Sequence, residues 1–132
     1  MSYAYNMLSL KNSIVAVDFD GTVVEHMYPN VGPDVPHAVS MLRVMRDLGN
    51  KIILYTMRSD STLLDAVMWY KERNIELWGI NENPEQHSWT GSPKVYANVY
   101  IDDAAFGCPI IAFNGKPVVD WVAVGRRLLG VI

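Results

Sequence analysis

Two aspartates separated by one residue, Asp18 and Asp20, directly follow the apolar run Ile14–Val17. Two carboxylates beside a buried strand carry a desolvation cost and repel each other, so a compensating positive group is expected. A second acidic pair, Asp102 and Asp103, follows another apolar segment. Carboxylate oxygens without a converging histidine or cysteine favour a hard cation, and Mg²⁺ is the commonest such ion beside phosphate. The acids therefore predict a magnesium site.

Four further residues have the chemistry that binds a phosphoryl group. Thr56 offers a hydroxyl donor, and Lys94 offers a positive charge that would also reduce repulsion among the acids. Gly21 allows close backbone approach, and the free N–H groups of its loop can face an anion. Arg58 is a candidate for contacting the leaving group or a second phosphate oxygen, and a surface arginine at a helix start is an equal alternative. These residues extend the predicted metal site into a phosphate site.

Alternating strands and helices are expected to position these side chains. Apolar β-branched runs predict strands, and apolar residues at helical spacing predict helices. The predicted strands cover 13–18, 51–56, 75–80, 97–102 and 109–114, and the predicted helices cover 36–48, a segment from the cap candidates at 59–62 to 73, and 120–129. Residues 23–36, with three prolines, predict a loop or small hairpin lying over Asp18.

This alternation indicates an α/β fold with a Rossmann-like central parallel sheet of about five strands flanked by helices. In such sheets ligands bind beyond the carboxyl ends of the strands. Six polar residues are expected at that edge: Asp18, Asp20, Thr56, Lys94, Asp102 and Asp103. The predicted topology therefore gathers the polar residues into one place.

The composition fits one small globular domain over residues 1–132. Half of the 132 residues are hydrophobic, which is enough for a core, and the single cysteine, Cys108, excludes an internal disulfide and favours a reducing compartment. The sequence has no signal-peptide pattern, so a cytoplasmic location without a membrane partner is expected. A net charge of −3 argues against a nucleic-acid partner but leaves a nucleotide ligand open. Self-association into a homo-oligomer is also open.

The order of these motifs resembles the haloacid dehalogenase (HAD) superfamily. The match consists of Asp18-Phe19-Asp20-Gly21-Thr22, Thr56, Lys94 and Asp102-Asp103 in that order. The resemblance implies a Mg²⁺-dependent phosphohydrolase with an aspartyl-phosphate intermediate. It assigns Asp18 as nucleophile and metal ligand, and Asp20 as general acid and base whose backbone carbonyl binds the metal. Thr56 and Lys94 would hold the phosphate, and Asp102 and Asp103 would complete the metal site.

Two features depart from many members of that superfamily. Lys94 precedes Asp102 by only eight positions, which is closer than in many members of that superfamily. The segments 23–50 and 57–93 are filled by predicted loops, helices and a strand, so no room remains for a cap domain. The chain therefore resembles the capless branch, in which a large substrate or a neighbouring subunit covers the site.

Other functions and other residues stay open at this stage. A receiver-type signalling domain uses similar residues, but no aspartate ends its third predicted strand here, whose tip is Ile80-Asn81. A catalytically weak or inactive protein that binds Mg²⁺ and a phosphorylated partner remains an alternative, as does a phosphotransferase that uses the same residues. His26 and Tyr28 lie where a flap over the site is expected, and Trp89 is a further candidate for substrate contact. The phosphorylated substrate is not identified by the sequence.

Overall fold

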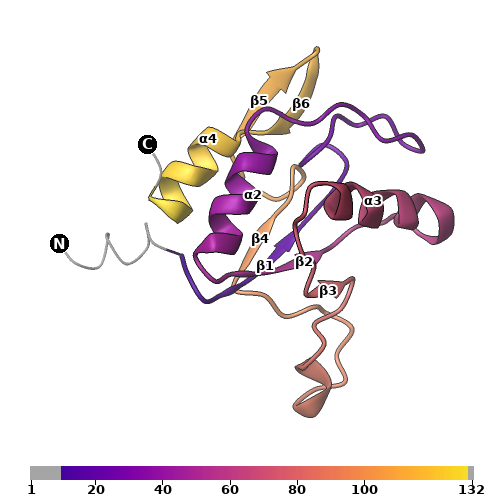
Figure 1. Ribbon diagram of the computed structural model, residues 1–132, viewed down its shortest axis with the longest axis vertical. Coiled ribbons are helices and arrows are strands. Elements are labelled where there is room, and N and C mark those ends of the chain that lie inside the picture. Colours follow the sequence, from indigo (N-terminus) through magenta and orange to yellow (C-terminus); the bar gives the residue numbers. More distant parts are fainter. Residues whose placement is uncertain (1–9, 131–132) are drawn as a thin grey trace.

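A parallel four-stranded sheet forms the centre of the protein. The computed structural model describes residues 10–130. The strands are β1 (Ile14–Val17), β2 (Lys51–Leu54), β3 (Gly79–Ile80) and β4 (Val99–Ile101), in the spatial order β3-β2-β1-β4 (Figure 1). Val17 lies beside Leu54 on one side and Ile101 on the other. The ends of β1, β2 and β4 are thus level, and the residues after them meet at one edge of the sheet.

Three helical segments pack around this sheet. They are α2 (Ala38–Asp47), α3 (Asp60–Glu72), and α4 (Trp121–Val124), which continues as the π-helical turn η2 (Gly125–Leu129). Figure 1 shows α2 between α4 and α3. Side chains alternate between the faces of a strand, so the core draws on alternate strand residues and on the helices, namely Val15, Val17, Ile52, Leu54, Leu42, Met45, Trp69, Tyr70, Trp121 and Val124.

The long connection from β3 to β4 contains a short 3₁₀ helix, η1 (Gln86–Ser88), and folds through buried side-chain amides. Gln86 donates from Nε2 to the carbonyls of Ser92 (3.1 Å) and Lys94 (2.7 Å) and accepts at Oε1 from the N–H of Tyr96 (2.7 Å). Since both donors and the acceptor of this amide are used, the connection has a defined conformation.

The prediction of a fifth strand in the central sheet is wrong. Residues Ile110–Phe113 do form a strand, β5, but it pairs antiparallel with β6 (Lys116–Val119) in a separate two-stranded sheet. The two residues between these strands, Asn114 and Gly115, both have positive φ, 52° and 78°. That is the backbone of a type I′ turn, for which Asn-Gly is the preferred sequence. The turn chemistry therefore makes a hairpin where the apolar pattern alone suggested a parallel strand.

Most other elements agree with their predictions, with shorter strands. The predicted strand 75–80 contributes only Gly79–Ile80 to the sheet. Helix α4 begins after Asp120, whose Oδ1 caps it by accepting the N–H of Ala123 at 3.2 Å. At the start of α3, the hydroxyl Oγ1 of Thr62 accepts the N–H of Ser59 at 3.3 Å, as in a capping box. Within residues 10–130, no helix is long and apolar enough to cross a membrane.

Candidate active site

Three carboxylates converge at the carboxyl edge of the sheet. Asp18 follows β1, and Asp102 and Asp103 follow the neighbouring strand β4. One carboxylate oxygen from each of these residues lies within 4.8 Å of the others. The backbone fixes the meeting of the two strand ends, because the N–H of Asp18 donates to the carbonyl of Ile101 at 2.9 Å. The sequence-based prediction that these three acids come together is therefore confirmed as geometry.

The electrostatics of this cluster favour a cation. The pKa of Asp18 is raised from 3.8 to about 8. Burial is the main cause, and the neighbouring carboxyl groups of Asp103 and Asp102 contribute to the same rise. The hydroxyl of Thr22 and the backbone of Phe19 act in the opposite direction. Burial also raises the pKa of Asp103. Without a positive group, the folded protein thus resists full ionisation of its own cluster.

Thr22 and Gly21 hold the cluster from behind. The Thr22 hydroxyl donates to Asp18 Oδ2 at 2.9 Å and accepts the N–H of Asp103 at 3.2 Å, so one buried side chain joins the two strand ends. Gly21 has φ of 79°, and a Cβ there would overlap the carboxylate of Asp103. Its N–H donates to the carbonyl of Val24 at 2.8 Å. The N–H of Gly21 itself is therefore engaged within the loop, and the absence of a side chain at Gly21 makes room for the carboxylate of Asp103.

Asp20 is held by an ion pair with Arg58. The guanidinium donates from Nε to Asp20 Oδ2 and from Nη2 to Asp20 Oδ1, both at 2.8 Å. Its remaining N–H groups donate to the carbonyls of Asn30 (2.8 Å), Thr62 (3.1 Å) and Pro29 (3.2 Å). All five donors of this buried side chain are occupied. The observed geometry thus makes Arg58 a support for Asp20, while its predicted phosphate contact stays a prediction.

The carboxylates line a cavity of about 560 Å³. Asp18, Asp20, Asp102 and Asp103 contribute to its wall, together with Thr56 and Arg58. Oγ1 of Thr56 accepts the N–H of Arg58 at 3.1 Å, which leaves the hydroxyl proton as a donor for a ligand. The rest of the lining is His26, Tyr28, Met57 and Ala104. The loop 23–36 therefore does lie over Asp18, as predicted.

Lys94 and Trp89 do not line this cavity. Lys94 is exposed, and its Nζ lies 6.0 Å from the ring centroid of Tyr100. Trp89 is 60% exposed and contacts the ring of Tyr96 edge-on, with 6.0 Å between centroids. Both residues belong to the connection from β3 to β4, whose fold could not be read from its turn-forming composition. The predicted phosphate-binding lysine is therefore not among the residues that line the cavity, and its assignment stays a prediction.

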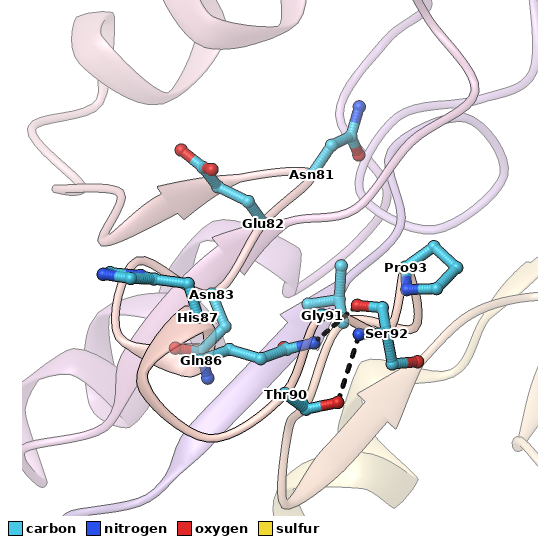
Figure 2. Close-up of a pocket in the computed structure, with 10 residues that line it drawn as sticks. Asn81, Glu82, Asn83, Gln86, His87, Thr90, Gly91, Ser92 and Pro93 are labelled. Atoms are coloured by element: carbon cyan, nitrogen blue, oxygen red, sulfur yellow. Dashed lines mark hydrogen bonds between the residues drawn. The ribbon is translucent and has the colours of Figure 1, made fainter.

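A second cavity, of about 300 Å³, lies within the same connection (Figure 2). Figure 2 shows the Gln86 amide bonded to Ser92, and the N–H of Ser92 bonded to Thr90 Oγ1 at 3.1 Å. The buried amides here are consumed by the protein's own backbone. No cluster of acids like that at Asp18 is found here among the described residues. The larger cavity is therefore the candidate active site.

Two features of the site escaped the sequence-based prediction. Thr22 lies in the quoted motif but received no role of its own, although a hydroxyl four residues after the first acid is a visible signal. Glu25 is 6% exposed and binds Asn114 Nδ2 (2.8 Å) and Lys116 Nζ (3.0 Å), which fastens the β5–β6 hairpin beside the cavity. These partners are about ninety residues apart in sequence, and no local pattern announces their contact.

The fold and the site define an α/β protein with a carboxylate cluster at the carboxyl edge of a parallel sheet. A solved structure described as the conserved protein coded by a locus from Bacteroides thetaiotaomicron has this fold, with a TM-score of 0.72 and 33% sequence identity. The match covers 86% of this chain and 87% of that one. The chain therefore belongs to the same family as this conserved protein. No protein-family model and no curated protein matches the sequence.

Proposed function

We propose that the protein is a Mg²⁺-dependent phosphomonoesterase of the haloacid dehalogenase type, which acts through an aspartyl-phosphate formed on Asp18. The observation that carries the proposal is the convergence of Asp18, Asp102 and Asp103 at the cavity wall. Asp20 and Thr56 line the same cavity, so a nucleophile, a candidate for proton transfer and a hydroxyl donor face one volume. That combination is what covalent phosphoryl transfer requires.

The donor set of the cluster fits a magnesium ion. Mg²⁺ prefers carboxylate and other oxygen ligands and is held by few protein groups, and the cluster offers oxygens only. The raised pKa of Asp18 supports the same assignment, because a cation would favour its ionised form. Asp18, Asp102 and Asp103 would hold the ion, with the backbone carbonyl of Asp20. When bound, the ion would offset the negative charge that the carboxylates and the phosphoryl group bring together.

The proposed reaction proceeds in two displacements at phosphorus. In the first, an Asp18 carboxylate oxygen attacks phosphorus, the bond to the leaving oxygen breaks, and Asp20 donates a proton to that oxygen. In the second, Asp20 takes a proton from water, the water oxygen attacks phosphorus, and the bond to Asp18 breaks, which releases inorganic phosphate. Thr56 donates to a phosphoryl oxygen, and Arg58 keeps Asp20 oriented.

One observation keeps a second candidate function in place. Among the described residues 10–130, Arg58 is the single lysine or arginine that lines the cavity, and all its N–H groups are already bonded. With so little positive charge of its own, the cavity would depend on the metal to attract phosphate. A protein that binds Mg²⁺ and a phosphorylated partner with weak or no turnover is therefore the alternative, and phosphotransfer to another acceptor is a variant of the main proposal.

Hydrolysis of p-nitrophenyl phosphate with and without Mg²⁺ tests the proposal. The wild type should turn over only with the metal, and Asp18→Asn should lower kcat by at least about 10³-fold, since it removes the nucleophile. Asp47→Asn, which changes an aspartate of the exposed α2 surface, is the matched control and should leave the rate unchanged. Turnover that survives Asp18→Asn would overturn the covalent mechanism.

A silent wild type would require a second measurement. Beryllium fluoride imitates an aspartyl-phosphate, so ¹⁹F NMR in the presence of Mg²⁺ should detect an adduct that Asp18→Asn abolishes. An adduct without turnover supports the binding protein, and the lack of an adduct removes the phosphatase. Product analysis in the presence of glycerol separates hydrolysis, which yields inorganic phosphate, from phosphotransfer, which yields glycerol phosphate.

A further inference from the structure

An aromatic ring stands at the mouth of the carboxylate cavity. Tyr28 lines the cavity and is 54% exposed. Its ring lies against the guanidinium of Arg58, whose Cζ is 5.2 Å from the ring centroid. The same guanidinium also contacts the ring of Phe19, at 5.1 Å, and Phe19 is fully buried in the core. Arg58 thus links the exposed ring of Tyr28 to the interior of the protein.

The contact with Arg58 gives the Tyr28 ring a fixed support. Arg58 is immobilised by five hydrogen bonds, two to Asp20 and three to backbone carbonyls. Two of those carbonyls, of Pro29 and Asn30, directly follow Tyr28 in the chain, so the support and the loop that carries the ring are joined. A ring held before the ligand arrives binds a partner with less loss of conformational entropy.

The position of Arg58 also indicates which end of a substrate would contact the ring of Tyr28. The same guanidinium that supports Tyr28 binds the carboxylate of Asp20 in a bidentate pair. In the proposed reaction, on which this inference rests, Asp20 protonates the leaving oxygen. Since Asp20 and Tyr28 both contact Arg58 and both line the cavity, a leaving group held at Asp20 lies within reach of the Tyr28 ring.

The remaining mouth residues match an apolar, planar leaving group. Met57 lines the cavity, is 98% exposed and offers a flexible thioether, which packs well against aromatic rings. The cavity volume of about 560 Å³ lies within the range that small-molecule sites occupy and is large enough for a mononucleotide.

We propose that Tyr28 and Met57 select phosphomonoesters whose leaving group carries a planar aromatic ring, as in a nucleoside monophosphate. The ring of the substrate stacks on the free face of Tyr28, and Met57 covers its other side. Aliphatic phosphates lack this contact and depend on the phosphate site alone.

Adenosine 5′-monophosphate and ribose 5-phosphate are the test substrates, because they share the 5′-oxygen that leaves and differ in the ring. The wild type with Mg²⁺ should have a kcat/KM for the nucleotide about tenfold or more above that for the sugar phosphate, as expected for one aromatic stack. Tyr28→Ala should remove most of this ratio by lowering the nucleotide rate alone. Tyr28→Phe should preserve the ratio, since stacking needs the ring and not the hydroxyl.

Trp89→Ala is the matched control, because it removes an exposed aromatic side chain that lies outside the cavity, and it should leave the ratio unchanged. Equal rates for both substrates in the wild type would overturn the inference and leave the phosphatase proposal intact. An equal loss of both rates in Tyr28→Ala would also overturn it, since Tyr28 would then act only by supporting Arg58. If the wild type shows no Mg²⁺-dependent hydrolysis of either substrate, the proposed function itself fails, and this result is distinct from the two above.

Phenyl phosphate and glycerol 3-phosphate form a second pair of test substrates. In phenyl phosphate the ring is attached directly to the leaving oxygen, whereas in adenosine monophosphate a ribose lies between them. If Tyr28→Ala lowers the rate for phenyl phosphate more than that for adenosine monophosphate, the ring sits directly at the leaving oxygen, and aryl phosphates are the preferred class. The reverse order assigns the nucleotide. Each result supports stacking on Tyr28 and places the ring along the cavity.

Discussion

A single hydroxyl, that of Thr22, connects the two halves of the carboxylate cluster. It donates to Asp18 and accepts from the backbone of Asp103, and its side chain has no exposure to solvent. Because its bond to Asp18 lowers the pKa of that carboxyl group, Thr22 favours the ionised form of Asp18. The hydroxyl therefore has both a structural and an electrostatic function in the site.

Thr22→Val tests this function with almost no change in shape. The variant leaves a buried N–H and a buried carboxylate without a partner, which should cost about 1–3 kcal/mol of unfolding free energy. Mg²⁺ affinity should fall as well, because the pKa of Asp18 rises further. Urea unfolding and calorimetric titration with Mg²⁺ measure the two effects. Thr22→Ser keeps the hydroxyl and should restore both, so a defect of equal size in the serine variant would assign the effect to packing.

Gly21 is required by the carboxylate of Asp103 and not only by its own backbone. Gly21→Ala adds a Cβ into the space of that carboxylate at a φ of 79°. We expect the variant to displace Asp103, to weaken Mg²⁺ binding and to reduce stability by about 1 kcal/mol or more. Gly91→Ala is the matched control, because a Cβ there meets nothing within 4 Å. Unchanged Mg²⁺ affinity in Gly21→Ala, measured by titration calorimetry, would show that Asp103 is not a ligand.

At the scale of elements, Arg58 ties three segments together. It lies between β2 and α3, binds Asp20 after β1, and bonds to carbonyls of the loop 23–36 and of α3. Its side chain is 1% exposed and that of Asp20 is 14% exposed. Removing one partner of such a pair strands the other charge.

Arg58→Ala should lower the unfolding free energy by about 3–5 kcal/mol, because it leaves Asp20 and three carbonyls unpaired. Arg58→Lys should recover only part of this, since an ammonium group cannot form the bidentate pair. Denaturant unfolding monitored by tryptophan fluorescence gives both values. A fully stable Arg58→Ala variant that had lost only phosphate affinity would instead support the original sequence-based assignment of Arg58 to phosphate binding.

The elements were predictable where one local pattern decided them. Strands β1 and β2 could be predicted from their continuous apolar runs. Helix α2 could be predicted from the helical spacing of its apolar residues. The segment Ile110–Phe113 shows where this fails, because its apolar pattern fits a parallel strand as well as a hairpin strand. The Asn114-Gly115 turn decides between the two arrangements, because this dipeptide favours a two-residue hairpin.

The site was predictable for the same reason and to the same extent. Asp18, Asp102 and Asp103 follow strands that the α/β pattern assigns to one parallel sheet, so their position at one edge of it could be foreseen. Lys94 depends on an eighteen-residue connection, 81–98, whose path is set by the buried amides of Asn83 and Gln86. Such side-chain to backbone bonds have no sequence period, and the position of Lys94 could not be predicted from its type and order alone.

At the scale of the whole molecule, the stability of the protein and the proposed metal binding would be linked through one carboxyl group. The pKa of Asp18 is about 8 in the folded protein and 3.8 as its ordinary value. Between these values the unfolded chain has lost a proton that the folded protein retains. The folded state therefore binds more protons, and the free energy of unfolding falls as pH rises from about 4 to about 8. Asp103, whose pKa is also raised, adds to the same slope.

Magnesium should reverse this dependence, because it binds the ionised cluster and not the protonated one. In EDTA we expect Tm to fall from pH 5 to pH 8, and the gain in Tm on adding Mg²⁺ to grow over the same range. Asp18→Asn should flatten the slope in EDTA and abolish most of the Mg²⁺ gain, whereas the surface variant Asp47→Asn should behave as the wild type. Thermal unfolding by circular dichroism at half-unit pH steps measures both curves. A Mg²⁺ gain that is constant with pH would mean that the ion binds elsewhere, since an ion held by Asp18 must compete with the proton that burial and the neighbouring acids keep there.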